Sequence, residues 1–405
     1  MKFSNSSILK PKNISTAEIL PIFFLAGRLL FYLALLPTDL HGMGDFPNYF
    51  SVTSLQGLPF FNYWTEYPPL FAFLIEVIHI ISQGNQFLFD FYLYILITIS
   101  GAISIWLFSK IASHLLTNPN DVVFTSFIYF GFLAFISYSW WYFELVVVSI
   151  ILITIHLLMI KKEKSVGLWL GIGILAKWFP LLLFPAIFLF SEKKKFLKIT
   201  LIAVGMVVFV WGCLYIFSPE LTLASLKSQS SRNSWETIWA LIDGNMVTGA
   251  FIPLENRLNP SLINQHYGNS AKIPVWLTFV FFSGVGIFLM KKIKNLNKKN
   301  MISFIGITWI LFFLWSPGWS PQWILYLIPL ILLTLPIHKG FLIVFLLSSI
   351  SLLEWPVLLG RHIFQGLWIL ILFRLLIFIF LFTFWTGGLL KTVNALLRQT
   401  TNFEK

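Results

Sequence analysis

EKKKFLKITLIAVGMVVFVWGCLYIF, residues 192–217, joins a basic start to a long uncharged run. No residue from Ile199 to Phe217 carries a charge, whereas four lysines stand among the seven residues before it. A helix rises about 1.5 Å per residue, so about 20 apolar residues cross a hydrocarbon layer roughly 30 Å thick. The stretch therefore predicts a membrane-spanning helix near 198–217, with its basic end on the cytoplasmic side.

The composition of the whole chain supports a membrane environment. Of its 405 residues 58% are hydrophobic, 18% aromatic and 11% charged, and the mean hydropathy is +0.83. A soluble domain of this length could not bury that much apolar surface. We expect one polytopic transmembrane domain over residues 1–405, with an uncleaved first span.

The net charge of +12 does not favour nucleic acid as a partner. The basic residues form short clusters at 161–164, 192–198 and 291–299, between apolar runs, which is typical of cytoplasmic loops. Cys213 is the only cysteine, so disulfides, a zinc site and thiol catalysis are not supported.

Eleven apolar runs are long enough, or close enough to others, to cross the membrane. They lie near 17–38, 87–109, 122–139, 143–160, 165–190, 198–217, 273–290, 300–315, 321–336, 340–354 and 364–386. Basic clusters flank both ends of 165–190, which predicts a hairpin of two half-helices turning near 176–180, so that the bundle has about twelve crossings. A single helix that crosses once is the alternative. The short segment 67–82 is predicted to be re-entrant or to lie near the outer surface.

The unusual residues gather on the predicted outer face, in loops 39–66 and 218–272. Asp45 follows the first span and stands beside Gly44; it is either a solvated loop acid or a general base, with Asp39 as its nearest rival. Glu66 opens a Tyr-Pro-Pro step and is either a second catalytic or orienting acid or only the polar end of an apolar segment.

Two cations stand within apolar runs. Arg28 in the first run and Lys177 in the predicted hairpin suggest binding of an anionic lipid phosphate, because an intramembrane charge is costly. Arg28 pairing with Glu144, and Lys177 reaching the surface, are the alternatives. Trp178 beside Lys177 predicts a site lined by rings and one charge.

The larger outer loop and a later outer turn supply further candidates. Arg232 suits phosphate binding, and a short helix is expected from Trp235 to Ile242, ending near Gly244. In 319–323, Pro321 is expected at a helix start, Gln322 can bond a sugar hydroxyl, and Trp323 can pack on a sugar ring or an isoprenoid tail. A Walker loop, a GxGxxG loop and an HExxH motif are missing from the sequence, which argues against an ATP-driven pump.

Several motifs, in this order, resemble the GT-C superfamily of membrane glycosyltransferases. They are AGRLLFYL, GDFPNYF, EYPPL, AKWFPLLLFP and SPQWILYLIPL. Glycosyltransferase family 87 and the catalytic subunit of GPI mannosyltransferase I are the most similar families. The resemblance implies an all-α integral-membrane bundle with short helices in its outer loops, and inverting transfer of a hexose, by default mannose, from a polyprenyl-phosphate sugar donor.

The resemblance also implies roles for individual residues. It implies that Asp45 is the general base, that Lys177 and Arg232 bind the donor phosphate, and that Tyr49 and Tyr67 line the site. Glu144 is expected to shape the site. Many GT-C members carry two neighbouring acids in the first outer loop, but Asp45 has no second acid within two residues. No cofactor is firmly implied, and a divalent cation stays an open alternative.

The expected partners are a polyprenyl-phosphate sugar, a glycan, glycolipid or protein acceptor, and the lipid bilayer. The expected location is the plasma membrane, with the active site on the extracytoplasmic side. A lipid or lipid-linked glycan flippase is the main rival, because transporters also place broken helices and charges at their sites. A hydrolase or polymerase of lipid-linked glycans is a third option.

Overall fold

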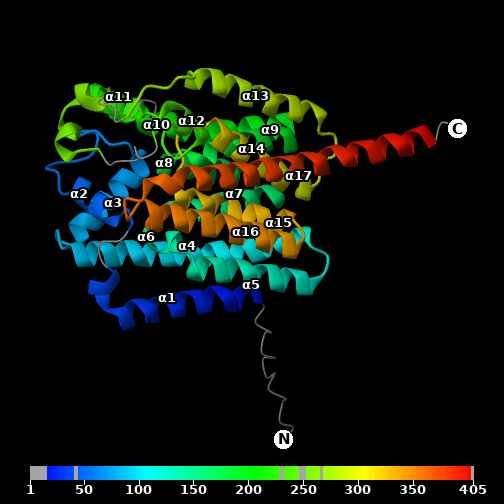
Figure 1. Cartoon of the computed structure of the whole chain (residues 1–405), viewed down its shortest axis with the longest axis horizontal. Helices are drawn as coiled ribbons and strands as arrows, with labels where there is room; N and C mark the ends of the chain where they lie inside the picture. Colours follow the sequence, from blue (N-terminus) through cyan, green and yellow to red (C-terminus); the bar gives the residue numbers. More distant parts are fainter. Residues whose placement is uncertain (1–15, 41–43, 229–231, 246–251, 265–267, 403–405) are drawn as a thin grey trace, which may run out of the picture.

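The computed structural model describes residues 16–40, 44–228, 232–245, 252–264 and 268–402, and the regular secondary structure within these ranges is helical. The described part contains isolated bridges, Pro59 with Tyr63 and Trp235 with Gly318, but no strand. Long helices run roughly parallel to one another, and both described ends of the chain lie at one end of the bundle (Figure 1).

Each of the eleven predicted apolar runs falls on helix. The main helices are α1 (Thr16–Leu40), α4 (Gln86–Leu115), α5 (Pro119–Phe135), α7 (Glu144–Met159), α8 (Glu163–Ala176), α9 (Phe184–Phe190), α10 (Lys193–Phe217), α13 (Val275–Lys292), α14 (Lys298–Trp315), α15 (Ile324–Thr334), α16 (Ile337–Leu352) and α17 (Leu367–Asn402). Among the described residues, five helical segments are long and apolar enough to cross a membrane: Gln86–Leu115, Lys193–Phe217, Val275–Lys292, Ile337–Leu358 and Phe364–Leu390. The chain is therefore a helical membrane protein, and the figure of about twelve crossings stays a prediction.

Helices α8 and α10 run in the same direction, which shows how 165–190 folds. A Cβ atom at Gly167 would lie 2.9 Å from the carbonyl oxygen of Ile199, and one at Gly171 would lie 3.3 Å from Cα of Ala203. The basic starts of both helices meet where Lys195 Nζ lies 3.9 Å from a carboxylate oxygen of Glu163. The chain must return between them, so the predicted hairpin is confirmed. Its break is Lys177, followed by η1 (Phe179–Leu183) and then α9.

Helices α1 and α4 run in opposite directions. A Cβ atom at Gly101 would lie 2.5 Å from the Phe24 ring, the hydroxyl of Tyr94 donates to the carbonyl of Arg28 at 2.9 Å, and the Tyr32 ring centroid lies 5.3 Å from that of Phe91. The end of α1 and the start of α4 therefore share one end of the bundle, together with α2 (Phe46–Thr53) and α3 (Pro69–Ile81), as Figure 1 shows. Segment 67–82 begins and ends there, in agreement with the prediction that it does not cross.

The second polar stretch contributes α11 (Pro219–Ser228), α12 (Ile238–Asp243), η2 (Leu254–Leu258) and η3 (Pro260–Asn264). Helix α12 begins three residues later than expected, because Thr237 is its N-cap and accepts from Ala240 N at 3.2 Å. It ends at Gly244, whose φ of 81° favours glycine, as the sequence predicted.

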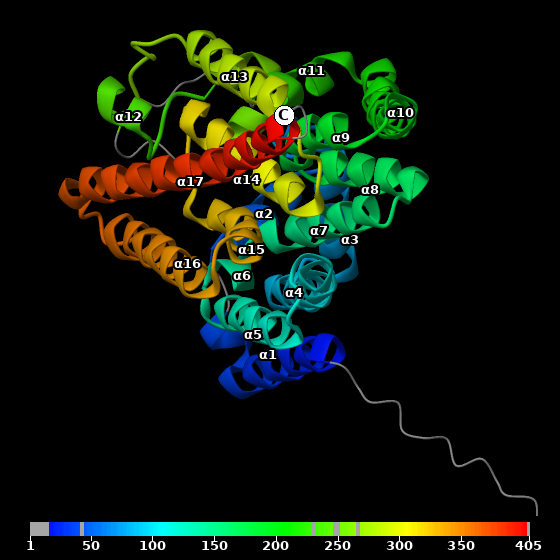
Figure 2. The same cartoon turned by 90° about the vertical axis from the view of Figure 1, so that its right-hand side faces the viewer.

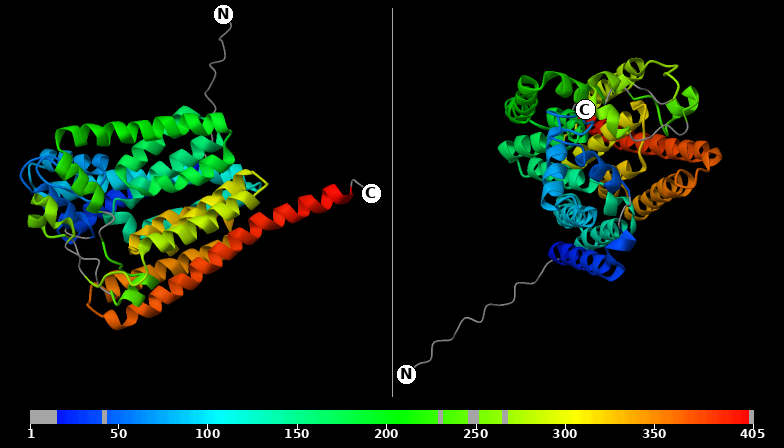
Figure 3. Two further views of the ribbon diagram at one scale, coloured as in Figure 1. Left: turned by 90° about the horizontal axis from the view of Figure 1, so that it is seen from above. Right: turned by 90° about the vertical axis from the view of Figure 1, so that its left-hand side faces the viewer.

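Helices on the edge of the bundle leave apolar faces uncovered. Seen along the helices, α1 lies at one edge, α13 at the opposite edge, and α16 and α17 at a third side (Figure 2). Exposed side chains on these edges are large and apolar, including Phe23, Leu33, Trp276, Phe281 and Phe373. Figure 3 shows α17 reaching beyond the other helices at its C-terminal end. Such a surface suits contact with lipid tails.

Candidate active site

Asp45 is held at the N-terminus of α2 by close backbone contacts. Gly44 has φ 60°, and a Cβ atom there would lie 2.7 Å from Cβ of Trp141 and 2.9 Å from its carbonyl oxygen. This approach lets Asp45 N donate to the Trp141 carbonyl at 3.3 Å. The hydroxyl of Tyr49, one turn along α2, donates to Asp45 Oδ2 at 3.1 Å. The GDFPNY sequence thus fixes one carboxylate against the 138–144 turn.

The surroundings of Asp45 give it the proton affinity of a base at neutral pH. Burial and the nearby Glu144 carboxylate raise the pKa of Asp45 to about 7, although the Lys177 ammonium and the Tyr49 hydroxyl lower it. Its side chain is half-buried, so part of its surface is accessible. A carboxylate with a pKa near the working pH is well matched to general base catalysis.

Glu144 and Lys177 form an ion pair beside Asp45. Glu144 stands in the first turn of α7 and is fully buried, whereas 23% of the Lys177 side chain is exposed. Lys177 Nζ donates to Glu144 Oε1, and Glu144 Oε2 has no hydrogen-bond partner in the described part of the chain. The alternative that Arg28 pairs with Glu144 is therefore wrong. Lys177 keeps an exposed face from which its ammonium can meet a second anion.

Glu66 forms a second ion pair, with the buried Arg257. Arg257 Nη2 donates to Glu66 Oε1 at 2.9 Å and Nη1 donates to Glu66 Oε2, while Arg232 Nη2 lies 3.6 Å from Oε1. Burial alone would raise the pKa of Glu66, but the two guanidinium groups outweigh it and lower the pKa to about 2. A carboxylate with this pKa holds no proton at neutral pH, so the geometry favours a positioning role over that of a second base.

Two tyrosines connect the Asp45 and Glu66 groups. The amide of Asn48 donates to the Tyr67 hydroxyl at 3.0 Å, and the rings of Tyr49 and Tyr67 lie 5.6 Å apart. Burial, followed by the nearby carboxylates, raises the pKa of both tyrosines well above the usual value. Both phenols therefore stay protonated and serve as hydrogen-bond donors or acceptors near the acids.

Arg28 is bonded to the backbone of its neighbours. Its guanidinium donates to the carbonyls of Ser139 at 3.1 Å and Leu133 at 2.6 Å and to Ser139 Oγ at 2.5 Å. It also lies 3.7 Å from the ring centroid of Trp140 and is only 3% exposed. These contacts give Arg28 a structural role, and they leave Lys177 and Arg232 as the candidates for a phosphate.

Aromatic rings fill the space between the Lys177 break and the Arg232 loop. Trp178 stacks on Trp211 at 5.9 Å, and Trp323 lies 6.5 Å from Trp235, over which the Arg232 guanidinium sits at 5.9 Å. Phe179 follows Trp178 in the chain, and its ring lies 5.0 Å from that of Trp323 and 4.3 Å from that of Tyr326, so it connects the two groups. Pro321 begins a 3₁₀ turn, and Gln322 and Trp323 are half-buried in it.

A third buried charge group was missed by the sequence reasoning. Arg374 of α17 pairs with Glu354 in the turn η5 (Leu353–Leu358) and donates to the carbonyl of Glu236. The rule that singled out Arg28, a charge inside an apolar run, applies equally to Arg374 and would have found it. No sequence pattern singled out Arg257, which pairs with Glu66.

The donor set at this end does not form a metal cage. No group of three or more His, Cys, Asp or Glu side chains in the described residues could hold a metal ion. The cation beside Asp45 and Glu144 is instead the ammonium of Lys177.

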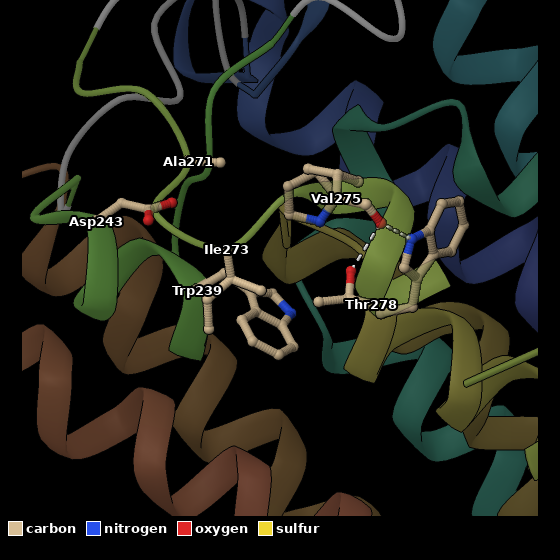
Figure 4. A pocket seen from close by; sticks show the side chains of 8 residues that line it. Trp239, Asp243, Ala271, Ile273, Val275 and Thr278 are labelled. Atoms are coloured by element: carbon tan, nitrogen blue, oxygen red, sulfur yellow. Dashed lines mark hydrogen bonds between the residues drawn. The ribbon is translucent and has the colours of Figure 1, made fainter. Parts of the chain in front are cut away.

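A separate pocket lies between α12 and the start of α13 (Figure 4). Asp243 projects from the end of α12 toward the segment that carries Ala271 and Ile273, and its Oδ1 accepts from Lys272 N at 2.8 Å. Its Oδ2 accepts from Ser234 Oγ at 2.6 Å. Both carboxylate oxygens of Asp243 thus accept hydrogen bonds within the loop, and neither is free to bind a ligand.

Comparison with known proteins adds little. No protein-family model matches the chain, and no curated protein matches it. A solved structure, the oligosaccharyltransferase of Archaeoglobus fulgidus tethered to an acceptor peptide, is similar at a TM-score of 0.38 and 12% identity. The similarity covers 92% of this chain and 55% of that chain, so the chain spans about half its length. A likeness this distant transfers neither a residue nor an activity.

Proposed function

We propose that this chain is a membrane glycosyltransferase of GT-C type, which moves a hexose from a polyprenyl-phosphate sugar to an acceptor hydroxyl. One observation carries the proposal: Asp45, half-buried with a pKa of about 7, lies beside the Glu144–Lys177 ion pair. The arginines of the Glu66 group lie at the same end of the bundle. This transfer needs a base that takes the acceptor proton and cations that can meet the leaving phosphate.

The reaction uses the groups as follows. The acceptor hydroxyl attacks the anomeric carbon and gives its proton to the Asp45 carboxylate. The bond between that carbon and the phosphate oxygen breaks on the opposite face, which inverts the configuration. Polyprenyl phosphate leaves as an anion toward Arg232, which is 34% exposed, and toward the exposed face of Lys177.

Supporting roles follow from the contacts. Tyr49 orients the Asp45 carboxylate, and Glu66 holds Arg232 and Arg257. Gln322 and Trp323 border the ring cluster, where a planar aromatic face can pack on a sugar or an isoprenoid unit. We propose that the site faces the extracytoplasmic side of the plasma membrane. The side is supported by Lys177, which ends α8, because the basic start of that helix lies at its other end.

The test is transfer by the purified protein in detergent. Radiolabelled polyprenyl-phosphate mannose and glucose are offered with glycan, glycolipid and peptide acceptors, and the anomeric configuration of any product is determined by NMR. The proposal predicts a labelled product of inverted configuration. Absence of transfer with every donor, together with translocation of the lipid in reconstituted vesicles, would support the flippase instead.

A further inference from the structure

A buried charge group joins the Arg232 loop to the C-terminal helix. Arg374, Glu354 and Glu236 are 3%, 0% and 7% exposed. Arg374 donates from Nη1 to the Glu354 carboxylate and from Nη2 to the backbone carbonyl of Glu236, and its guanidinium lies 4.6 Å from the ring centroid of Trp319. One guanidinium therefore contacts three different segments of the chain.

The group holds two carboxyls but only one guanidinium. In the described part of the chain, Oε2 of Glu236 and Oε2 of Glu354 lack hydrogen-bond partners. Burial and the Glu354 charge raise the pKa of Glu236 well above its usual value. The Glu354 carboxylate takes the ion pair with Arg374, so Glu236 is the carboxyl that keeps a proton.

Glu236 also has an unusual backbone. Its φ of 51° lies in the left-handed region, which is unfavourable for a residue with a side chain. Neighbouring contacts hold it there: Trp235 N donates to Pro317 O at 3.1 Å, Trp319 N donates to Trp235 O at 3.1 Å, and Thr237 Oγ1 donates to Pro317 O at 2.8 Å. A Cβ atom at Gly318 would lie 2.2 Å from the Trp235 ring, so only glycine permits this approach.

The segment fixed in this way is the one that bears Arg232. Arg232 stands four residues before Glu236, packs over Trp235 and lies 3.6 Å from Glu66. Loss of the Arg374 hydrogen bond to the Glu236 carbonyl would therefore let the Trp235 ring move, and the Arg232 guanidinium packs over that ring. Arg374 does not itself contact Glu66 or Asp45 in any described contact, so its effect on the site passes through this loop.

We propose that Arg374 is a positioning residue, with Glu354 as its counter-ion and Glu236 as a neutral acid, and that it holds segment 232–237 so that Arg232 faces the donor phosphate. This inference rests on the proposed function. Arg374 and Glu354 then set the affinity for the donor without contacting it. Glu354 is charged, whereas Glu236 is neutral.

The test compares Arg374→Gln, Arg374→Lys, Glu354→Gln and Glu236→Gln with Arg361→Gln, which removes an exposed arginine between α16 and α17. Arg374→Gln and Glu354→Gln are expected to raise the donor KM about tenfold while the acceptor KM changes less than twofold. Arg374→Lys recovers part of the loss, because lysine keeps the charge but not the two-pronged geometry. Glu236→Gln behaves as wild type, because an amide replaces a neutral acid.

A second readout needs no catalysis. Limited trypsin digestion followed by mass spectrometry measures cleavage after Arg232, which is expected to be faster in Arg374→Gln and Glu354→Gln only. If no donor is turned over but cleavage after Arg232 changes as expected, the proposed function is wrong, and the role of Arg374 in holding segment 232–237 is supported. If transfer occurs but Arg374→Gln and Glu354→Gln leave the donor KM and the cleavage rate unchanged, Arg374 does not position segment 232–237.

Folding of each variant is checked by size-exclusion chromatography. Should Arg374→Gln aggregate, Glu354→Gln and Arg374→Lys still report on the ion pair. A rise in the donor KM for Glu236→Gln as large as that for Glu354→Gln would overturn the assignment of Glu236 as the protonated acid.

Discussion

Replacing Glu144 by glutamine is expected to move the pH dependence of transfer toward acid. Burial and the Glu144 charge are the main reasons that the pKa of Asp45 is raised to about 7, so removing that charge lowers it. A charge within about 4–6 Å shifts a pKa by one unit or more, and one unit corresponds to 1.36 kcal/mol. The substitution also releases Lys177 from its ion pair, which lowers the pKa of Asp45 further.

The size of the effect follows from the ionised fraction. The reaction requires the ionised carboxylate, so its rate falls as pH drops below the pKa of Asp45. At pH 6 a group with a pKa of about 7 is roughly one-tenth ionised, and one with a pKa of about 6 is half ionised. Relative to its own plateau at high pH, Glu144→Gln should therefore be roughly fivefold faster than wild type at pH 6.

The assay is the initial rate of sugar transfer from pH 5 to 9 at saturating donor. Tyr49→Phe supplies a shift in the opposite direction, because it removes the hydroxyl that lowers the pKa of Asp45. Glu220→Gln, an exposed acid at the start of α11, is the matched control and should leave the midpoint in place. A midpoint that stays put or rises in Glu144→Gln would refute the role given to Asp45.

Three further substitutions test the other charge groups. Glu66→Gln should lower the free energy of unfolding by about 3 kcal/mol at pH 7, because the pKa of Glu66 is lowered from 4.5 to about 2; this stabilisation is present above about pH 4.5 and is lost as pH falls through about 2. Denaturant unfolding in detergent measures the change, and the double variant with Arg257→Gln should lose less stability than the two single variants added together. Arg232→Gln should raise the donor KM about tenfold with a smaller change in kcat, as removal of a charge-assisted bond predicts, and an unchanged KM would exclude it from the phosphate site. Arg28→Met should cost about 2–4 kcal/mol of stability because three hydrogen bonds are lost, yet leave the donor KM within twofold; a large change in that KM would return Arg28 to the site.

The helices and their directions could be predicted because lipid imposes simple rules. Apolar length gave the helical runs, and the basic clusters at both ends of 165–190 required a hairpin, which the parallel packing of α8 and α10 confirms. The same logic kept 67–82 at one end of the bundle. Helix starts at Pro321 and helix ends at Gly244 were predictable from local chemistry alone.

The partners of the charged residues could not be predicted from the sequence. Arg28 meets Ser139, which is 111 residues away, and Glu66 meets Arg257, which is 191 residues away. No local pattern distinguishes an arginine bonded to carbonyls from one that awaits a phosphate, because the difference lies in tertiary packing. Lys177 and Glu144 were chosen for separate reasons, and only the fold brings them together beside Asp45.

Replacing Asp45 by asparagine removes the carboxylate that is proposed as the general base. Single-turnover transfer from a labelled polyprenyl-phosphate sugar is measured for wild type, Asp45→Asn and the control Glu220→Gln at pH 8. Loss of a general base predicts a rate about 10²–10⁴-fold lower for Asp45→Asn, with donor binding retained and the control at the wild-type rate. Transfer by folded Asp45→Asn at the wild-type rate would exclude Asp45 as the general base.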